Sequence, residues 1–146
     1  MAINVLLINR SNNPSPKYAE DGDAGMDLRA YIESPVIIQP MERALIPTGL
    51  YIALPNGYEA QVRPRSGLAL KHGITVLNTP GTVDSKYRGE IGIILINMGK
   101  VPFKVENGDR VAQIVFKKVE TATFIETDEL PDTERGEEGF GHTGVK

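Results

Sequence analysis

Short runs of β-branched and other apolar residues, rather than long amphipathic stretches, dominate the pattern along this chain. They cover residues 3–9, 26–32, 36–39, 43–54, 58–64, 74–78, 90–97, 103–105, 110–119 and 122–126. Turn formers such as "EDGDAG", "PNG", "NMGK" and "ENGD" separate them. Strand-like runs that recur every 8 to 12 residues or so, roughly as here, predict an all-β sandwich or barrel.

One stretch alone predicts a helix. It is "SGLALKHG", residues 66–73, which lies between two strand-like runs. Ser66 suits the N-cap position because its side-chain oxygen can accept a hydrogen bond from a free backbone N–H. Gly73 suits the left-handed position that follows the last helical turn. The pattern therefore predicts a single short helix in an otherwise all-β protein.

The run "EIGIILIN" departs from simple alternation, because it is apolar at nearly every position from Ile91 to Ile96. Such a strand is covered on both of its faces. In a small β-protein the second cover can come from another subunit, which predicts an oligomer. A central strand of a closed barrel explains the run equally well, and the pattern leaves both interpretations open.

The character of the chain changes after Val119. Residues 1 to 119 hold 14 Lys/Arg and 11 Asp/Glu, a balance of +3, whereas residues 120 to 138 hold eight acidic residues against Arg135 alone. Periodicity ends at Ile125 and Pro131 follows. We therefore expect a β-barrel domain over residues 1–119 and a C-terminal arm over residues 120–146. The mildly basic body suits a small anionic ligand rather than a nucleic acid.

The composition excludes several classes of chemistry. The chain has no cysteine, which excludes disulfides, thiol catalysis and cysteine metal sites. Its two histidines are too few for a zinc site without cysteine. No apolar run approaches the roughly 20 residues that span a membrane, and the first residues lack the basic region of a signal peptide. We expect a cytoplasmic protein with no membrane or nucleic-acid partner.

Two stretches carry groups that suit a phosphate. In "RPRSGLAL", Arg65 and Ser66 stand where the short helix begins, and a helix N-terminus with a guanidinium and a hydroxyl favours an anion. Surface arginines beside a capped helix are the plainer alternative. In "GDRVAQIVF", Arg110 and Gln113 interrupt an apolar strand, although both positions also suit ordinary outward-facing residues.

Two further stretches carry carboxylates. In "AGMDLRA", Asp27 follows a glycine turn and can hold Mg²⁺ through water, since magnesium prefers oxygen ligands. "NTPGTVDSKYRGE" predicts a hairpin whose backbone and Asn78 can match the edge of a pyrimidine ring. Asp84 and Tyr87 follow within the next turn. An aspartate in a turn commonly caps its own backbone, so Asp84 by itself does not establish a catalytic site.

The last motif lies almost at the end of the chain. "RGEEGFGHTG", residues 135–144, has the glycines, basic residue and hydroxyl of a phosphate-binding loop. Such loops normally open a helix, and here only two residues follow. A phosphate loop in this place needs the rest of its pocket from elsewhere.

Five stretches occur in one order: "AGMDLRA", "PRSGLAL", "GTVDSKYRGE", "GDRVAQIVF" and "RGEEGFGHTG". Together they resemble the five ordered motifs of the trimeric deoxyuridine triphosphatase (dUTPase) family, from Ala24 to Gly144. The resemblance implies a homotrimer of jelly-roll-like β-barrels, of the β-clip type, with three active sites at the subunit contacts. It also implies that the arm of one subunit closes the site of a neighbour, which gives the terminal loop its purpose.

The resemblance further implies the reaction, in which dUTP and water give dUMP and pyrophosphate with Mg²⁺ on the triphosphate. This activity limits uracil incorporation into DNA and supplies dUMP for dTMP synthesis. Asp84 would be the general base, and positioning of the water would contribute much of the rate. Asp27 would act weakly on Mg²⁺ through water, and Arg110 would be structural. The implied substrate-binding residues are Arg65, Ser66, Gly67, Asn78, Thr82, Val83, Asp84, Tyr87, Gln113, Arg135, Phe140, Gly141, His142 and Thr143.

Selectivity follows from the same resemblance. The main chain of residues 78–84 and Asn78 would match the uracil edge, where cytosine would leave groups mispaired. Tyr87 would lie under the deoxyribose and leave no room for a 2′-hydroxyl, and Phe140 would stack on the uracil. The family commonly has serine where His142 stands, so binding of the arm is expected to depend on pH.

Two other functions compete with this one. A deoxycytidine triphosphate deaminase shares the fold but has a catalytic glutamate ten residues after the hairpin aspartate, and that position here is Ile94. A β-barrel that binds nucleotides without turnover is the non-catalytic alternative. Pyrophosphate release from dUTP distinguishes the hydrolase from both.

Overall fold

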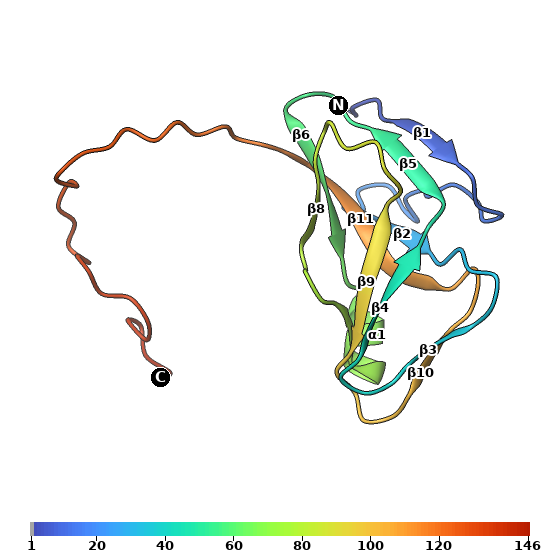
Figure 1. Cartoon of the computed structure of the whole chain (residues 1–146). Coiled ribbons are helices and arrows are strands. Elements are labelled where there is room, and N and C mark those ends of the chain that lie inside the picture. Colours follow the sequence, from blue (N-terminus) through green and yellow to red (C-terminus); the bar gives the residue numbers. More distant parts are fainter. Residues whose placement is uncertain (1) are drawn as a thin grey trace.

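The computed structural model describes residues 2–146, and its body consists of small antiparallel sheets wrapped around one core (Figure 1). The strands are β1 (Leu6–Asn9), β2 (Gly25–Arg29), β3 (Val36–Ile38), β4 (Arg43–Pro47), β5 (Leu50–Ala53), β6 (Tyr58–Arg63), β7 (Ile74–Val76), β8 (Gly81–Val83), β9 (Gly92–Asn97), β10 (Phe103–Val105) and β11 (Arg110–Lys118). The helix α1 covers Ser66–His72. The predicted all-β class with one short helix is confirmed.

Strands that follow one another along the chain lie in different sheets. The sheet orders are β1-β5, β10-β3, β2-β11-β6-β8 and β4-β9-β7. The chain therefore passes back and forth across a shared core, which is typical of jelly-roll-like architectures. The core consists of the inward residues of these strands, such as Leu28, Ile46, Ile93 and Leu95, which are fully buried. No described helix is long and apolar enough to cross a membrane.

The helix begins one residue earlier than the capping prediction implies. Arg65, not Ser66, occupies the N-cap position with an extended backbone, and its side chain makes no capping hydrogen bond. Its guanidinium is engaged elsewhere, while Ser66 is the first helical residue. The prediction for the other end is confirmed, because Gly73 ends the helix with a left-handed φ of 68°. The start of the helix thus presents an exposed Ser66 and Gly67 beside Arg65.

The predicted hairpin around "TPGT" takes a different form. β7 and β8 flank the turn but do not pair with each other, since β7 pairs with β9 and β8 pairs with β6. The turn carries the chain from one sheet to the next, and the Thr79–Pro80 peptide within it is cis. As a result β8 is the last strand of its four-stranded sheet.

The apolar run Ile91–Ile96 has one covered face and one open face in the single chain. Ile93 and Leu95 point into the core, whereas Ile94 and Ile96 are half-buried on the other side of β9. Leu45 lies opposite Ile94 on β4 and is 69% exposed. The second cover that the sequence predicts is therefore not supplied by the residues described in this chain.

The C-terminal arm leaves the body after β11 and runs away from every sheet (Figure 1). The strand predicted over residues 122–126 is wrong for the single chain, because this segment is extended without a pairing partner. Phe124 is 95% exposed and Ile125 is also exposed. A strand needs a neighbour to satisfy its backbone groups, and the arm finds none on its own body.

Candidate active site

Three of the sequence motifs meet at one end of the four-stranded sheet. Gln113 on β11 lies opposite Asp27 on β2 and opposite Arg63 on β6. Arg65, just beyond β6, places its Nε 3.2 Å from Asp27 Oδ1. The Arg110 guanidinium lies 3.7 Å from the other oxygen of the same carboxylate. We call these residues, with the helix start, the phosphate cluster.

Hydrogen bonds hold this cluster in place. Arg65 Nη1 donates to the carbonyl of Arg110 at 2.9 Å, and Gln113 Nε2 donates to the carbonyl of Pro64 at 3.0 Å. The Nη2 side of the Arg65 fork has no protein partner within residues 2–146. Since a guanidinium presents its donors in a rigid fork, the fixed Nε and Nη1 aim the remaining donors outward. The cluster therefore offers oriented cationic donors to an anion.

The stretch from Asn78 to Tyr87 forms a second group, the base-site turn. Its strand β8 is the edge of the sheet, so one side of its backbone has no neighbouring strand. The amide of Asn78 lies beside the start of β8, because a Cβ added to Gly81 would meet Asn78 Nδ2 at 3.3 Å. Thr82 is exposed and Val83 is buried. Free backbone groups next to a side-chain amide can match the polar edge of a flat ring.

Asp84 differs from two other aspartates that lie in turns, Asp23 and Asp109. Asp23 Oδ2 accepts a hydrogen bond from the N–H of Glu20 at 2.9 Å, and Asp109 Oδ2 accepts one from Glu106 at 2.8 Å. These two carboxylates cap their own turns. The Asp84 carboxylate is exposed and has no hydrogen-bond or ion-pair partner in the described chain. The capping alternative therefore fails for Asp84, and its carboxylate is free to act on a ligand.

Tyr87 is held at both ends within the same turn. Its backbone N–H donates to the carbonyl of Asp84 at 3.1 Å, and its hydroxyl donates to the carbonyl of Glu90 at 2.8 Å. The Glu90 carboxylate in turn accepts from the N–H of Gly49 at 2.7 Å, which fixes the turn to the body. Tyr87 as a whole remains 45% exposed. Tyr87 thus presents a fixed aromatic surface beside Asp84.

The phosphate cluster and Asp84 lie at opposite ends of β6. β8 runs antiparallel to β6, with Gly81 opposite Val62 and Val83 opposite Ala60. Continued by one residue, this register places Asp84 beside Glu59 near the start of β6, whereas Arg65 lies beyond the end of the strand. At about 3.3 Å per residue the two are about 20 Å apart along the sheet. One chain does not bring its carboxylate and its phosphate-binding groups together.

The arm loop, residues 135–144, contacts neither group, yet it is folded. Arg135 Nε donates to the carbonyl of Glu138 at 2.8 Å, and the N–H of His142 donates to the carbonyl of Gly139 at 2.9 Å. Gly141 takes a left-handed φ of 77° between these turns. His142 Nδ1 also contacts the Glu138 carboxylate. The loop is therefore shaped before it meets any partner.

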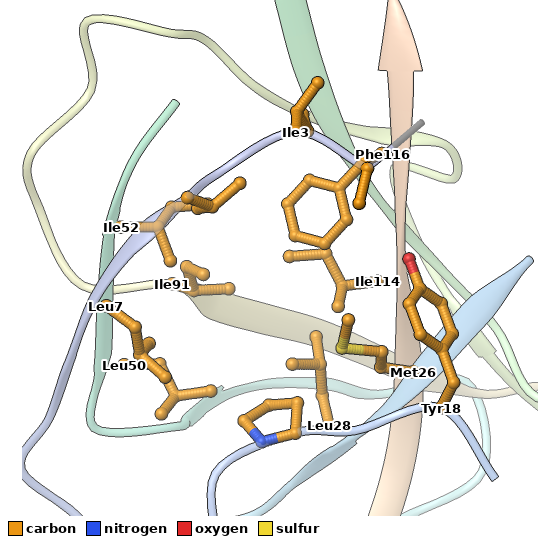
Figure 2. Close-up of a pocket in the computed structure, with 13 residues that line it drawn as sticks. Ile3, Leu7, Tyr18, Met26, Leu28, Leu50, Ile52, Ile91, Ile114 and Phe116 are labelled. Carbon is orange, nitrogen blue, oxygen red and sulfur yellow. The ribbon is translucent and has the colours of Figure 1, made fainter. Parts of the chain in front are cut away.

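The apolar pocket of Figure 2 lies away from all of these residues. It has a volume of about 310 Å³ and lies between the N-terminal segment and strands β1, β2, β5 and β11. Leu7, Met26, Ile52 and Phe116 point into it, and the Tyr18 hydroxyl is among the few polar atoms near it. No residue of the phosphate cluster or the base-site turn lines it. A pocket of this composition cannot supply donors to a triphosphate.

Within the described chain, magnesium finds no cluster of side chains that would bind it by themselves. The described residues include no group of three or more acidic or histidine side chains that could hold a metal ion. Both oxygens of Asp27 face arginines, so this carboxylate is partly neutralised. Mg²⁺ keeps several waters and commonly binds one carboxylate together with substrate phosphates. A contact between Asp27 and a phosphate-bound ion through water fits these facts, whereas a protein cage does not.

The fold and the distribution of these groups define an all-β protein of the jelly-roll-like β-clip type, with cationic donors at one sheet end and a free carboxylate at the other. The sequence model of the dUTPase family matches residues 11–144. This match covers most of the chain, and the chain belongs to the dUTPase family.

Several curated relatives carry the name deoxyuridine 5′-triphosphate nucleotidohydrolase. The protein of Treponema denticola is 63% identical over 130 residues, which is 89% of this chain and 90% of that protein. The protein of Finegoldia magna is 53% identical over 140 residues, or 96% of this chain and 98% of that protein.

Solved structures support the same fold. A mutant Staphylococcus bacteriophage 80alpha dUTPase with dUpNHpp has a TM-score of 0.88 at 24% identity, covering 99% of this chain and 100% of that chain. A mutant dUTPase of S. aureus phage phi11 has a TM-score of 0.78 at 21% identity, covering 87% of this chain and 98% of that chain. The phi11 structure concerns the coordination of a structural Mg(II) ion.

Two residues that sequence reasoning did not single out emerge from the geometry. Glu138 contacts His142 within the arm loop, and Gly89 lies against the Tyr87 ring. Both belong to motifs that the sequence identified, but their neighbours depend on how each turn folds. The i,i+4 spacing of Glu138 and His142 was the only available signal for the first, and Gly89 gave none.

Proposed function

We propose that this chain hydrolyses dUTP to dUMP and pyrophosphate at sites shared between three copies of itself. The observation that carries the shared site is the separation of Asp84 from Arg65 and Gln113 along β6. A general base must lie within hydrogen-bond reach of the attacking water, and that water must reach the phosphorus. Since one chain keeps these groups apart, the base-site turn of one copy serves the phosphate cluster of another.

Open apolar surface supports the assembly. Leu45, Ile94 and Ile96 form an apolar face on the sheet β4-β9-β7 that no described residue covers. Leu6 and Ile8 are likewise exposed on β1. Large apolar patches on a protein surface mark interaction sites. A closed homotrimer buries such faces against copies of the same chain, and it places an arm from each copy beside a neighbour.

In the proposed chemical step, a water molecule attacks the α-phosphorus with its oxygen. Asp84 accepts a proton from this water as the attack occurs. The bond from this phosphorus to the α–β bridging oxygen breaks, and pyrophosphate leaves with the electron pair. The carboxylate suits this role because it is exposed and has no structural partner in the described chain. A carboxylate is a modest base, so the fixed position of the water contributes much of the rate.

The phosphate cluster binds the charged part of the substrate. Arg65 offers its free Nη2 donors, and Ser66 and Gly67 add a hydroxyl and backbone N–H groups. Gln113 orients the α-phosphate region from β11. Asp27 holds the Arg65 guanidinium and would contact a phosphate-bound Mg²⁺ through water. The ion, when bound, neutralises charge that develops on the pyrophosphate.

The base-site turn selects the nucleoside. The free backbone edge at Thr82 and Val83, together with the Asn78 amide, pairs with the uracil edge, and a cytosine there leaves mispaired groups. Tyr87 lies under the deoxyribose and excludes a 2′-hydroxyl. Residues of the arm loop then close the site from a neighbouring chain. They are Arg135, Phe140, Gly141, His142 and Thr143, with Phe140 stacking on the base.

Release of pyrophosphate from dUTP with Mg²⁺ tests the activity. We expect turnover of dUTP, and no ammonia from dCTP, because Ile94 stands where the deaminase needs a glutamate. Binding of dUTP without pyrophosphate release would instead identify a non-catalytic nucleotide-binding barrel. Mass determination in solution tests the assembly, and a fully active single subunit would contradict it.

The contact between Glu138 and His142 fixes which nitrogen of the imidazole faces the carboxylate. An ionised carboxylate only accepts hydrogen bonds, so Nδ1 of His142 carries the proton that faces Glu138. The second nitrogen, Nε2, then donates to a phosphate only when the ring is doubly protonated. Imidazole changes its charge near neutral pH. A phosphate contact from Nε2 of His142 therefore requires a protonated ring.

We expect KM for dUTP to change between pH 6 and pH 8.5 relative to the His142→Ser variant. Serine donates at every pH, and dividing the two KM values cancels the ionisation of the substrate itself. Steady-state kinetics in matched buffers with saturating Mg²⁺ measure this ratio. A ratio that stays constant across the range would remove His142 from phosphate recognition.

A further inference from the structure

The Tyr87 ring packs against Gly89, and any larger residue at position 89 would displace the ring. A Cβ built on Gly89 would lie 2.5 Å from Tyr87 Cζ and 2.8 Å from Cε1, and closer still to the hydroxyl oxygen. Real Cβ atoms essentially never approach other atoms so closely. The ring therefore lies directly on the backbone of the turn at Gly89.

The backbone at Gly89 does not itself require glycine. Its φ lies outside the left-handed region, in contrast to Gly73 or Gly108. An L-residue at this position is therefore free of backbone strain. The three atoms nearest to a side chain there all belong to Tyr87, and they form the outer end of a partly exposed side chain. A substitution should displace the ring and leave the fold intact.

We propose that Gly89 is a positioning residue that sets sugar selectivity, an inference that rests on the proposed role of Tyr87. Because Gly89 has no side chain, the ring can pack against the backbone of the turn. In that position the Tyr87 hydroxyl reaches the carbonyl of Glu90 at 2.8 Å. A methyl group at position 89 lifts the ring and breaks this hydrogen bond. The surface beneath the deoxyribose then loses its fixed position, and the 2′-hydroxyl of UTP is no longer refused as strictly.

The turn is otherwise well anchored, so the effect should stay local. Glu90 bonds to Gly49, and the N–H of Ile91 donates to the carbonyl of Leu50 at 2.8 Å. Neither bond involves the Tyr87 ring. Displacement of the ring thus leaves Asp84 and β8 in place, and selectivity should change more than kcat for dUTP.

A double-mutant cycle tests this assignment. The four proteins are wild type, Gly89→Ala, Tyr87→Ala and the double variant, each assayed for kcat/KM with dUTP and with UTP. We expect Gly89→Ala to lower the preference for dUTP over UTP by about tenfold. In the Tyr87→Ala background the same change should alter the preference by less than about twofold, because the ring that it displaces is absent.

The outcomes separate this inference from the proposed function. If Tyr87→Ala relaxes the preference but Gly89→Ala does not, the inference is wrong and the sugar contact of Tyr87 stands. If Gly89→Ala acts equally in both backgrounds, it acts through the fold and the inference is also wrong. If wild type turns over dUTP but Tyr87→Ala keeps the preference for dUTP over UTP, the roles assigned to Tyr87 and to Gly89 are both wrong.

A milder variant covers the case in which Gly89→Ala is too unstable to assay, as thermal unfolding will show. Tyr87→Phe removes only the hydroxyl and leaves the ring free to rest on Gly89. We expect it to lose less than about threefold of the preference for dUTP. A loss as large as that of Tyr87→Ala would show that the ring is positioned by the hydrogen bond to Glu90 and not by its packing against Gly89.

Discussion

Replacement of Asp84 by asparagine is expected to lower kcat for dUTP by about 10³-fold, the range for loss of a general base. Asparagine keeps the size and shape of the side chain but accepts no proton from water. Asp84 has no structural partner in the described chain, so the fold should not change. Affinity for dUMP should stay within a few-fold of wild type. Pyrophosphate release measures kcat, and calorimetric titration measures binding.

Asp109→Asn is the matched control. Asp109 also stands in a turn, but its carboxylate caps the backbone N–H of Glu106, and asparagine can still accept that hydrogen bond. We expect this variant to retain wild-type kcat within about threefold. Strong residual activity of Asp84→Asn, or an equal loss in both variants, would exclude Asp84 as the base.

Local chemistry predicted most of the fold. β-branched runs and turn residues located the strands of the body, because a strand of a small sheet needs one apolar face and a turn at each end. Gly73 was predictable because few other residues accept the backbone that ends the helix. The start of the helix was not predictable in the same way. Arg65, which follows β6 closely, occupies the N-cap position in place of Ser66.

Features that depend on distant partners were the ones that sequence patterns missed. Residues 122–126 have the apolar character of a strand but no partner on their own body, and a strand forms only with a neighbour. The turn around Pro80 looked like a hairpin because both flanks are strand-like. Pairing with β9 and β6 decides otherwise. Sheet partners are set by the whole fold and not by the turn.

The same distinction holds for the site. The residue types near Arg65, Asp84 and Gln113 predict phosphate binders and a base, and these roles stay predictions. Their separation along β6 was not predictable, because it depends on which end of the sheet each turn reaches.

Removal of residues 135–146 is expected to reduce kcat/KM for dUTP by about 100-fold while the trimer stays intact. The deletion would remove the proposed contacts of Arg135 and His142 with phosphate and the proposed stacking of Phe140 on the base. None of these residues packs on the body of its own chain, so the fold should be unaffected. Steady-state kinetics and mass determination in solution measure the two quantities. Normal turnover by the shortened chain would refute the role of the arm as a lid.

Co-expression of the shortened chain with full-length Asp84→Asn tests whether the two parts of the site come from different copies. Each protein alone should be nearly inactive, because one lacks the arm and the other lacks the base. In randomly mixed trimers, about one quarter of the sites combine an intact Asp84 with an arm from another chain, and this fraction should be active. If instead each arm closed over the Asp84 of its own chain, no mixed site would be complete and the activity would not recover. Mixing the separately purified trimers without subunit exchange is the control, and it should also give no recovery.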